Sequence, residues 1–363
     1  MRLQFKYLYT NTQKGIGVYF NFYKNKFIKN IKDGGNIMKI MKEVKHFSHS
    51  DLDGVGCIVM GKHIFLHTSH TICDYNNVNE KVREFIFHYI DENGKVKDVV
   101  PYELVLITDI SVNEETALML EHFSRVTGVP ILLIDHHKTS LWLNDYEWAF
   151  VEPERNGMKT SGTSEIFHLL VKESEVLSNE LKQELELFSE MVRLYDTWDW
   201  FSQNVEMAKM LNDLLYIIGY DRFIERFTED LSVSLTEQEL YLLKVENERA
   251  ERYIKSKEKT LIKTELYGYN VGVVFAEQHH SILGNTICQN NPDIDFVLII
   301  NPAIKKVSIR SVKEDIDTGE FAKKYYGGGG HPKASGFELD DSLVETVIDL
   351  LLKKDKKEVT NRP

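Results

Sequence analysis

The sequence predicts an α/β protein of two domains, in which an N-terminal parallel-sheet domain is joined by a helical connector to a smaller C-terminal α/β domain. Residues 42–200 alternate apolar runs with amphipathic stretches, which is typical of a sheet built from crossover units. Residues 203–262 lack proline and place apolar residues three and four apart, as helices do. A chain of 363 residues, 42% hydrophobic and 28% charged, is long enough to bury two cores.

Three apolar runs in the N-terminal domain each lead into a cluster of acidic or histidine residues. The carboxyl ends of the strands in an open parallel sheet meet at one edge, and ligands bind there. We therefore expect the three clusters to share one edge of one sheet. The runs and their clusters are 44–47 with His49, Asp51 and Asp53; 104–107 with Asp109; and 131–134 with Asp135, His136 and His137.

The C-terminal part is expected to contain strands over 266–275, 296–300 and 307–309, followed by a glycine loop over 327–330 that opens a further element. These patterns set the expected limits of the domains. The limits are 38–202 for the N-terminal domain, 203–264 for the connector, 265–355 for the C-terminal domain and 356–363 for a tail.

The first 37 residues differ from the rest in composition. They hold seven Lys or Arg residues, one acid and eight aromatic residues, without the apolar centre of a signal peptide. One interpretation is a basic-aromatic arm for nucleic acid or a membrane. The interpretation we favour is translated sequence upstream of a start at Met38 or Met41, because Gly34-Gly35 can be encoded by a purine-rich, ribosome-binding-like stretch.

The charge and the apolar patterning exclude several classes of protein. The formal net charge is −12, and since the first 37 residues carry +6, the remainder carries −18. Such a body repels a long phosphate backbone, which argues against long duplex DNA as a partner. No stretch reaches the roughly 18 apolar residues of a membrane span. Three cysteines without a CxxC pair provide neither a disulfide framework nor a thiolate zinc site, and they favour a cytoplasmic location.

The strand-end clusters have the residue types of a site for hard divalent cations. Alternate carboxylates at Asp51 and Asp53 suit Mn²⁺ or Mg²⁺, and Asp196, after a helical stretch, adds a fourth cluster. Each residue also has a simpler explanation. The first motif could be an Asp-Gly turn, Asp109 could cap a helix near Asn113, the two histidines could be polar loop residues, and Asp196 could pair with Arg193.

In order and spacing, the four clusters resemble the motifs of the DHH phosphoesterase superfamily, named for an Asp-His-His motif that stands here at 135–137. The resemblance covers residues 44–340. The segment Gly327-Gly-Gly-Gly-His331-Pro-Lys-Ala-Ser-Gly-Phe337 resembles the glycine-rich motif of the type 1 DHH-associated domain, and a strand with Arg310 precedes it as expected. His49 departs from some branches, because it stands only two residues before Asp51.

The resemblance implies two metal ions, Mn²⁺ with Mg²⁺ or Co²⁺ as substitutes, bridged by Asp109 and activating a shared water. His137 would contact the scissile phosphate, and Asp135 would orient a neighbouring histidine. The implied metal ligands are His49, Asp51, Asp53, Asp109, His136 and Asp196, and the implied substrate contacts in the second domain are Arg310, Gly328, Gly329, Gly330 and His331.

Within the superfamily, the chain most resembles stand-alone oligoribonucleases that degrade very short RNA. Residues 303–333 carry seven basic residues and four acids, and this local excess of +3 favours short single-stranded oligonucleotides or dinucleotides over polymers. Three alternatives stay open: a phosphodiesterase for cyclic or linear signalling dinucleotides, a nucleoside 3′,5′-bisphosphate phosphatase, and a non-catalytic nucleic-acid binding protein. The sequence leaves the oligomeric state open.

Overall fold

The computed structural model describes residues 43–339 and residue 346. The chain divides into two compact units, the first ending at Leu243 and the second beginning at Lys244. The expected N-terminal extension (1–37) and tail (356–363) lie outside the described residues. Among the helices that are described, none is both long and apolar enough to cross a membrane.

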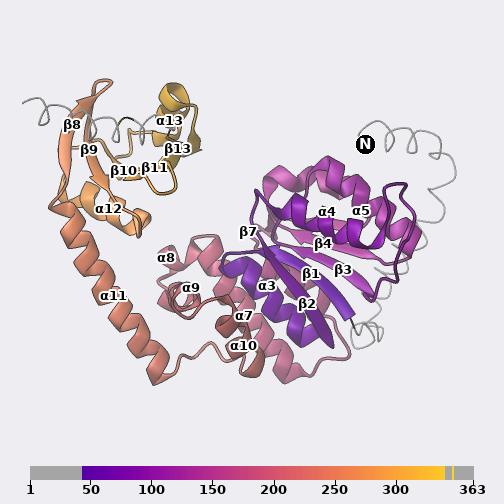
Figure 1. Cartoon of the computed structure of the whole chain (residues 1–363). Helices are drawn as coiled ribbons and strands as arrows, with labels where there is room; N and C mark the ends of the chain where they lie inside the picture. The colour runs from indigo at the N-terminus through magenta and orange to yellow at the C-terminus, as the bar shows by residue number, and fades with distance from the viewer. Residues whose placement is uncertain (1–42, 340–345, 347–363) are drawn as a thin grey trace, which may run out of the picture. The chain divides into compact units, whose positions relative to one another are not determined.

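The first unit is built on a five-stranded parallel sheet in the order β2-β1-β3-β4-β5 (Figure 1). The central strands β3 and β4 are apolar and buried along their whole length, as strands covered on both faces must be. The strands are β1 (Glu43–His49), β2 (His67–Cys73), β3 (Leu104–Thr108), β4 (Ile131–Asp135) and β5 (Ala149–Val151), with a separate hairpin of β6 (Glu154–Arg155) and β7 (Met158–Lys159).

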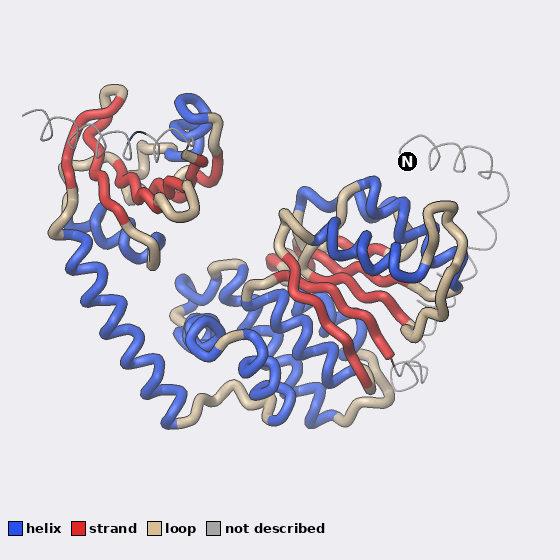
Figure 2. The backbone as a smooth tube through the Cα atoms, viewed as in Figure 1, coloured by secondary structure: helices blue, strands red, loops and turns tan. Residues whose placement is uncertain are grey.

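Helices cover both faces of this sheet (Figure 2). One face packs against α4 and α5 in an apolar cluster that includes Phe123, and the other packs against α3, α7, α9 and α10 in a cluster that includes Phe188. The helices are α3 (Leu52–Ile64), α4 (Val78–Tyr89), α5 (Glu114–Thr127), η1 (Lys138–Asp145), α6 (Gly162–Ile166), η2 (Phe167–Val171), α7 (Asn179–Asp196), α8 (Asp199–Gln203), α9 (Glu206–Ile218) and α10 (Tyr220–Glu229).

The region expected to be a connector is helical. Its helices α9 and α10 pack into the core of the first unit, where Leu214, Leu215 and Phe227 are buried. Helix α11 (Glu237–Glu258) spans the division between the units. Residues 206–229 are thus part of the first unit's apolar core, because their apolar stripes meet α3 and α7.

The second unit contains a mixed six-stranded sheet in the order β12-β13-β11-β10-β9-β8. Most of the strand expected over 266–275 is present as β9, but it begins only at Tyr269, because Tyr267 and Gly268 adopt positive φ angles (52° and 83°) and turn the chain into a hairpin with β8. The elements are β8 (Ile262–Leu266), β9 (Tyr269–Phe275), α12 (His280–Asn290), β10 (Phe296–Asn301), β11 (Lys306–Arg310), α13 (Thr318–Tyr326), β12 (Gly329–His331) and β13 (Ala334–Glu338).

Candidate active site

The three strand-end clusters lie at one edge of the first sheet, because β1, β3 and β4 are adjacent and parallel. The fourth cluster joins them from the last residue of α7, Asp196. Three overlapping groups of possible metal ligands form, and within each group the ligand atoms lie within 4.8 Å of one another. The groups are His49, Asp51 and Asp109; Asp53, His136 and Asp196; and Asp109, Asp135, His136 and His137.

The loop after β1 turns sharply to bring its two aspartates to this edge. Asp51 caps α3 by accepting the amide N–H of Gly54 at 3.0 Å. A Cβ atom on Gly54 would lie 2.3 Å from the carbonyl oxygen of His49, so only glycine allows this close approach. His49 Nδ1 lies 2.9 Å from Asp51 Oδ2, and this carboxylate outweighs burial to raise the pKa of His49.

Asp109 follows β3 in a strained backbone conformation with φ of 54°, while its amide N–H donates to the carbonyl of Ile134. Its carboxylate is 1% exposed. Burial, and then the charges of Asp53 and Asp51, raise the pKa of Asp109 well above its usual value. A carboxylate in this position needs a compensating cation to remain ionised.

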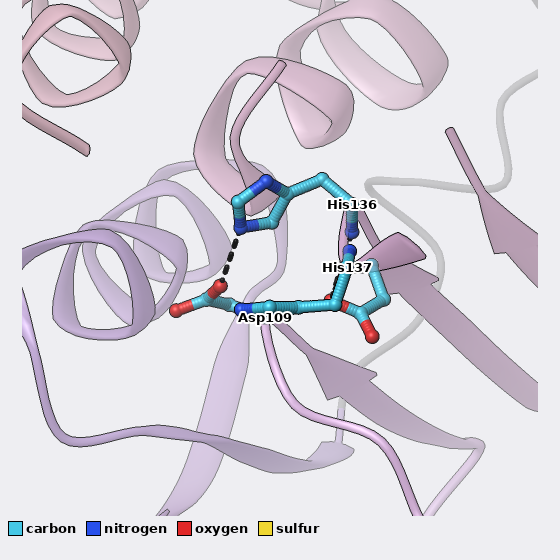
Figure 3. Close-up of side chains that lie close together, drawn as sticks. Asp109, His136 and His137 are labelled. Atoms are coloured by element: carbon cyan, nitrogen blue, oxygen red, sulfur yellow. Dashed lines mark hydrogen bonds and ion pairs between the residues drawn. The ribbon is translucent and has the colours of Figure 1, made fainter. Parts of the chain in front are cut away.

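His136 faces Asp109 across the site, and its Nε2 atom lies 3.2 Å from Asp109 Oδ1 (Figure 3). The same nitrogen lies 3.7 Å from Asp53 Oδ2 and 3.6 Å from Asp196 Oδ2. Burial, and then the charges of Asp53 and Asp51, raise the pKa of Asp196 well above its usual value. One imidazole nitrogen therefore converges with three carboxylates from three different elements.

Asp135 holds His137 in place. Its Oδ1 atom lies 2.7 Å from His137 Nδ1, and its Oδ2 accepts a hydrogen bond from the Ser111 hydroxyl. Although burial acts in the opposite direction, the hydrogen bond from His137 lowers the pKa of Asp135 to about 2. Asp135 is thus a buried anion that fixes the orientation of the His137 ring.

Asp53 is tied to the start of α6, which begins after the third cluster. Its carboxylate accepts the amide N–H groups of Gly162 at 2.5 Å and Thr163 at 2.9 Å. These amides lie at a helix N-terminus, where a negative charge is favoured. The start of α6, which Ser161 caps, therefore holds the carboxylate of one of the aspartates.

The simpler explanations for Asp109 and Asp196 do not hold. Helix α5 is capped by Asn113 itself, whose side chain accepts the amide N–H of Thr116. Arg193 pairs with Glu190 and Asp199, so it leaves Asp196 to the cluster.

The cluster fits divalent metal ions. Asp109 Oδ2 is buried and has no hydrogen-bond partner among the described residues, although His49 Nδ1 lies 3.7 Å away, so this ligand atom is available to a cation. The donor atoms are carboxylate oxygens and imidazole nitrogens, which suit Mn²⁺ and Mg²⁺ more than soft ions. Like charges at these distances also repel, and cations would relieve that repulsion.

In the second unit, Arg310 and His331 occupy one row of the sheet. Ala334 of β13 pairs with Arg310 on one side and with His331 on the other, so the two residues lie two strand spacings apart, about 10 Å. The Arg310 side chain donates to Ser281 Oγ of α12 at 3.1 Å, and burial lowers its pKa. The His331 side chain is exposed.

The predicted glycines lie along the same hairpin, over β12 and the turn before it. Gly330 has φ of 139°, and a Cβ atom on Gly328 would lie 2.2 Å from the carbonyl oxygen of Gly336, so both positions require glycine. Gly328 and Gly329 line a cavity of about 610 Å³, whereas Arg310 and His331 are not among its lining residues. The five predicted residues therefore lie in or next to the same sheet, but they do not line the same cavity.

Two residues of the site could not be found from sequence motifs. Ser111, two residues after Asp109, donates to Asp135, and Tyr75 from the β2–α4 loop lies 2.9 Å from His137 Nε2 through its hydroxyl. The only sequence signal for Ser111 is its place just beyond a strand end. Tyr75 follows β2, which reads as a polar edge strand without an acidic cluster.

Comparison with known proteins gives two curated relatives. The chain is 37% identical over 309 residues to oligoribonuclease NrnB of Bacillus subtilis, a match that covers 83% of this chain and 74% of the relative. It is 24% identical over 347 residues to a 3′,5′-cyclic-nucleotide phosphodiesterase of Helicobacter pylori, covering 83% of this chain and 94% of that one. No protein-family model matches the chain.

Solved structures share the fold. The DHH domain of a protein described as a member of a family of ribosomal proteins matches with a TM-score of 0.53 at 13% identity, covering 95% of this chain and 92% of that one. An exonuclease RecJ bound to manganese matches with a TM-score of 0.51 at 13% identity, covering 94% and 95%. Both confirm the predicted α/β fold.

Fold, site and relatives together define an enzyme that hydrolyses phosphoester bonds, and the open alternative of a non-catalytic binding protein is thereby set aside. More narrowly, the chain belongs to the DHH phosphoesterase family and is a phosphodiesterase of that family. Its Asp-His-His motif is Asp135-His136-His137.

Proposed function

We propose that this protein hydrolyses short single-stranded RNA oligonucleotides to nucleoside monophosphates, using a water activated by two divalent metal ions. The observation that carries the proposal is the convergence of carboxylates and imidazoles around Asp109, whose buried Oδ2 has no hydrogen-bond partner among the described residues. The relative named as an oligoribonuclease, at 37% identity, supports the choice of substrate.

The ligands divide around Asp109. His49, Asp51 and Asp109 would hold one ion, while Asp53, His136, Asp196 and the same Asp109 would hold the other. We expect Mn²⁺ in both positions, with Mg²⁺ or Co²⁺ as substitutes, because these ions accept mixed oxygen and nitrogen ligands. Two such ions, when bound, would lower the pKa of a shared water and offset the negative charge of the phosphate.

The remaining residues of the first unit position the substrate. His137 would contact the scissile phosphate, since its ring is held by Asp135 and lies beside His136. Asp135 keeps the ring oriented through the Nδ1 hydrogen bond, and Ser111 keeps Asp135 oriented in turn. The ring is thereby oriented in advance, and Nε2, which the Tyr75 hydroxyl contacts at 2.9 Å, is the nitrogen left to face the phosphate.

The second unit would hold the terminal nucleotide. Arg310 and His331 offer side-chain donors for phosphate, and the glycines at 328–330 leave the backbone accessible to a close anion. This arrangement favours dinucleotides and short oligomers over polymers, because affinity comes from a few terminal contacts. It also agrees with the acidic charge of the rest of the chain.

The test is hydrolysis of end-labelled RNA of two to twenty-four nucleotides by the purified protein with Mn²⁺. We expect catalytic efficiency to be highest for the shortest substrates and to fall with length. Asp109→Ala provides the inactive control. Equal rates on two and twenty-four nucleotides would contradict the proposal.

One alternative substrate class has a specific observation in its favour, namely the relative named as a 3′,5′-cyclic-nucleotide phosphodiesterase. Cyclic and linear signalling dinucleotides and a nucleoside 3′,5′-bisphosphate should therefore be included in the same assay. A higher catalytic efficiency on any of these than on two-nucleotide RNA would replace RNA as the substrate while leaving the site assignment intact.

A further inference from the structure

Tyr75 is an exposed aromatic residue that lies directly against the candidate active site. Its ring centroid lies 4.7 Å from that of His49 and 5.9 Å from that of His137, and its hydroxyl lies 2.9 Å from His137 Nε2. The residue is nevertheless 57% exposed. An exposed ring in contact with two histidines of the site is available to a ligand.

The ring is held in place at both ends. On the backbone side, the β2–α4 turn is closed by bonds between Asp74 and Asn77, and the Ser50 hydroxyl donates to Asp74 Oδ1 at 2.6 Å. Ser50 directly precedes Asp51, so the turn is tied to the loop that carries the first aspartates. On the other side, the hydroxyl is fixed by His137.

A phenol ring is uncharged near neutral pH, so it suits a flat uncharged group of a ligand rather than its phosphate. The contacts at both ends hold the ring in advance, and ordering it therefore costs little when a ligand binds.

We propose that Tyr75 is a stacking platform for the nucleobase next to the scissile phosphate. One side of the ring is taken by His49, and the exposed part remains for a base. Any base can stack on such a ring, because every base has a π-face. This inference rests on the proposed function, and it adds a base-binding subsite in the first unit, separate from the terminal contacts of the second.

The first test compares a dinucleotide with analogues that lack either base, using the full-length protein with Mn²⁺. In the unaltered protein, the base-bearing substrate should have the lower KM. In Tyr75→Leu that advantage should fall about tenfold or more, the order expected for losing one stacked base. Tyr241→Leu, at a similarly exposed tyrosine on α11, is the matched control and should keep the advantage.

The second test is spectroscopic and needs no turnover. The ligand is a dinucleotide with 2-aminopurine at one position and an abasic sugar at the other. Methylene groups replace the two oxygens that join the phosphorus to the sugars, so the ligand resists hydrolysis. Its fluorescence should be quenched on binding to the unaltered protein and to Tyr75→Phe, which retains the ring. Both isomers, with 2-aminopurine at the first or at the second position, are tested. Tyr75→Leu should quench the fluorescence much less in the isomer that the unaltered protein quenches.

Two outcomes overturn the inference. One is a Tyr75→Leu protein that retains both the KM advantage and the quenching. The other is loss of bound manganese in Tyr75→Leu, which would make Tyr75 a support of the metal site instead. If the unaltered protein cleaves no dinucleotide at all, the proposed function fails, and the quenching comparison still decides the role of Tyr75.

Discussion

Asp109 Oδ1 lies 3.2 Å from His136 Nε2, while the second oxygen of the same carboxylate is buried without a hydrogen-bond partner among the described residues. The second oxygen has only His49 Nδ1 near it, at 3.7 Å, which is beyond hydrogen-bond distance. Asp53 and Asp51, the strongest charges acting on it, are both negative. The site gains from binding cations and is strained without them.

Removing the charge of Asp109 should therefore stabilise the metal-free protein. Because its pKa is raised, Asp109 keeps its proton in the folded state above about pH 4, where the unfolded state has released it. Asp109 therefore lowers the free energy of unfolding as pH rises towards neutral. Asp109→Asn should raise the free energy of unfolding of the metal-free protein at pH 8 by about 1–3 kcal/mol, and by less at pH 5.

Thermal melting with and without Mn²⁺ measures this effect. Manganese should raise the Tm of the unaltered protein but leave Asp109→Asn almost unchanged, and the variant should be inactive. A variant less stable than the unaltered protein at pH 8 without metal would show that Asp109 is satisfied by the protein alone.

Asp196 and Asp199 should differ sharply although they are three residues apart. Asp196 converges on His136 Nε2, whereas Asp199 pairs with Arg193 at 2.9 Å. Asp196→Ala should lower kcat/KM at least a hundredfold and reduce bound manganese. Asp199→Ala should cost about 1 kcal/mol of stability, because Arg193 keeps Glu190, and should change activity little. Equal losses of bound metal in the two variants would contradict the assignment of the fourth cluster to Asp196.

Asp135→Asn should damage catalysis without emptying the metal site. The variant keeps an oxygen that can accept from His137 but loses the charge that, against burial, raises the pKa of that histidine. We expect kcat to fall about 10-fold to 100-fold, the usual effect of removing a residue that orients a functional histidine. Bound manganese, measured by atomic absorption after gel filtration, should stay within twofold of the unaltered protein.

The same carboxylate should also affect stability in acid. Because the pKa of Asp135 is held at about 2, its stabilising contribution is complete above the unfolded value near pH 4 and is lost as pH falls towards 2. The Tm difference between the unaltered protein and Asp135→Asn should therefore shrink between pH 4 and pH 2. A constant difference over that interval would mean that Asp135 has the same pKa in the folded and unfolded states.

The sequence predicts the strand-end clusters well, because apolar runs mark β1, β3 and β4 and the chain places polar residues at the end of each. The turn at Tyr267–Gly268 interrupts the strand expected over 266–275, and Gly268 marks it in the sequence, whereas a positive φ at tyrosine leaves no signal. Tyr75 could not be assigned either. Its proximity to His137 depends on the parallel pairing of β2 with β1, which brings a distant loop to the catalytic edge.

Arg310 and His331 should act on substrate capture and leave the metal centre intact, because they lie in the second unit while every ligand of the cluster lies in the first. Arg310→Ala and His331→Ala should each lower kcat/KM for a dinucleotide about 10-fold to 100-fold, the effect of losing a charged or polar contact to phosphate. Bound manganese should be unchanged. The exposed Arg252→Ala, also in the second unit, controls for the change of charge and should behave like the unaltered protein.

The choice of substrate makes this prediction specific. A small diester such as bis(p-nitrophenyl) phosphate has no terminal nucleotide for the second unit to hold, so its hydrolysis should change less than threefold in both variants. A dinucleotide needs these donors to place its phosphate at the cluster, and there the loss appears mainly in KM. If both substrates lose activity equally, or if either variant releases manganese, the second unit does not select the substrate through these two residues.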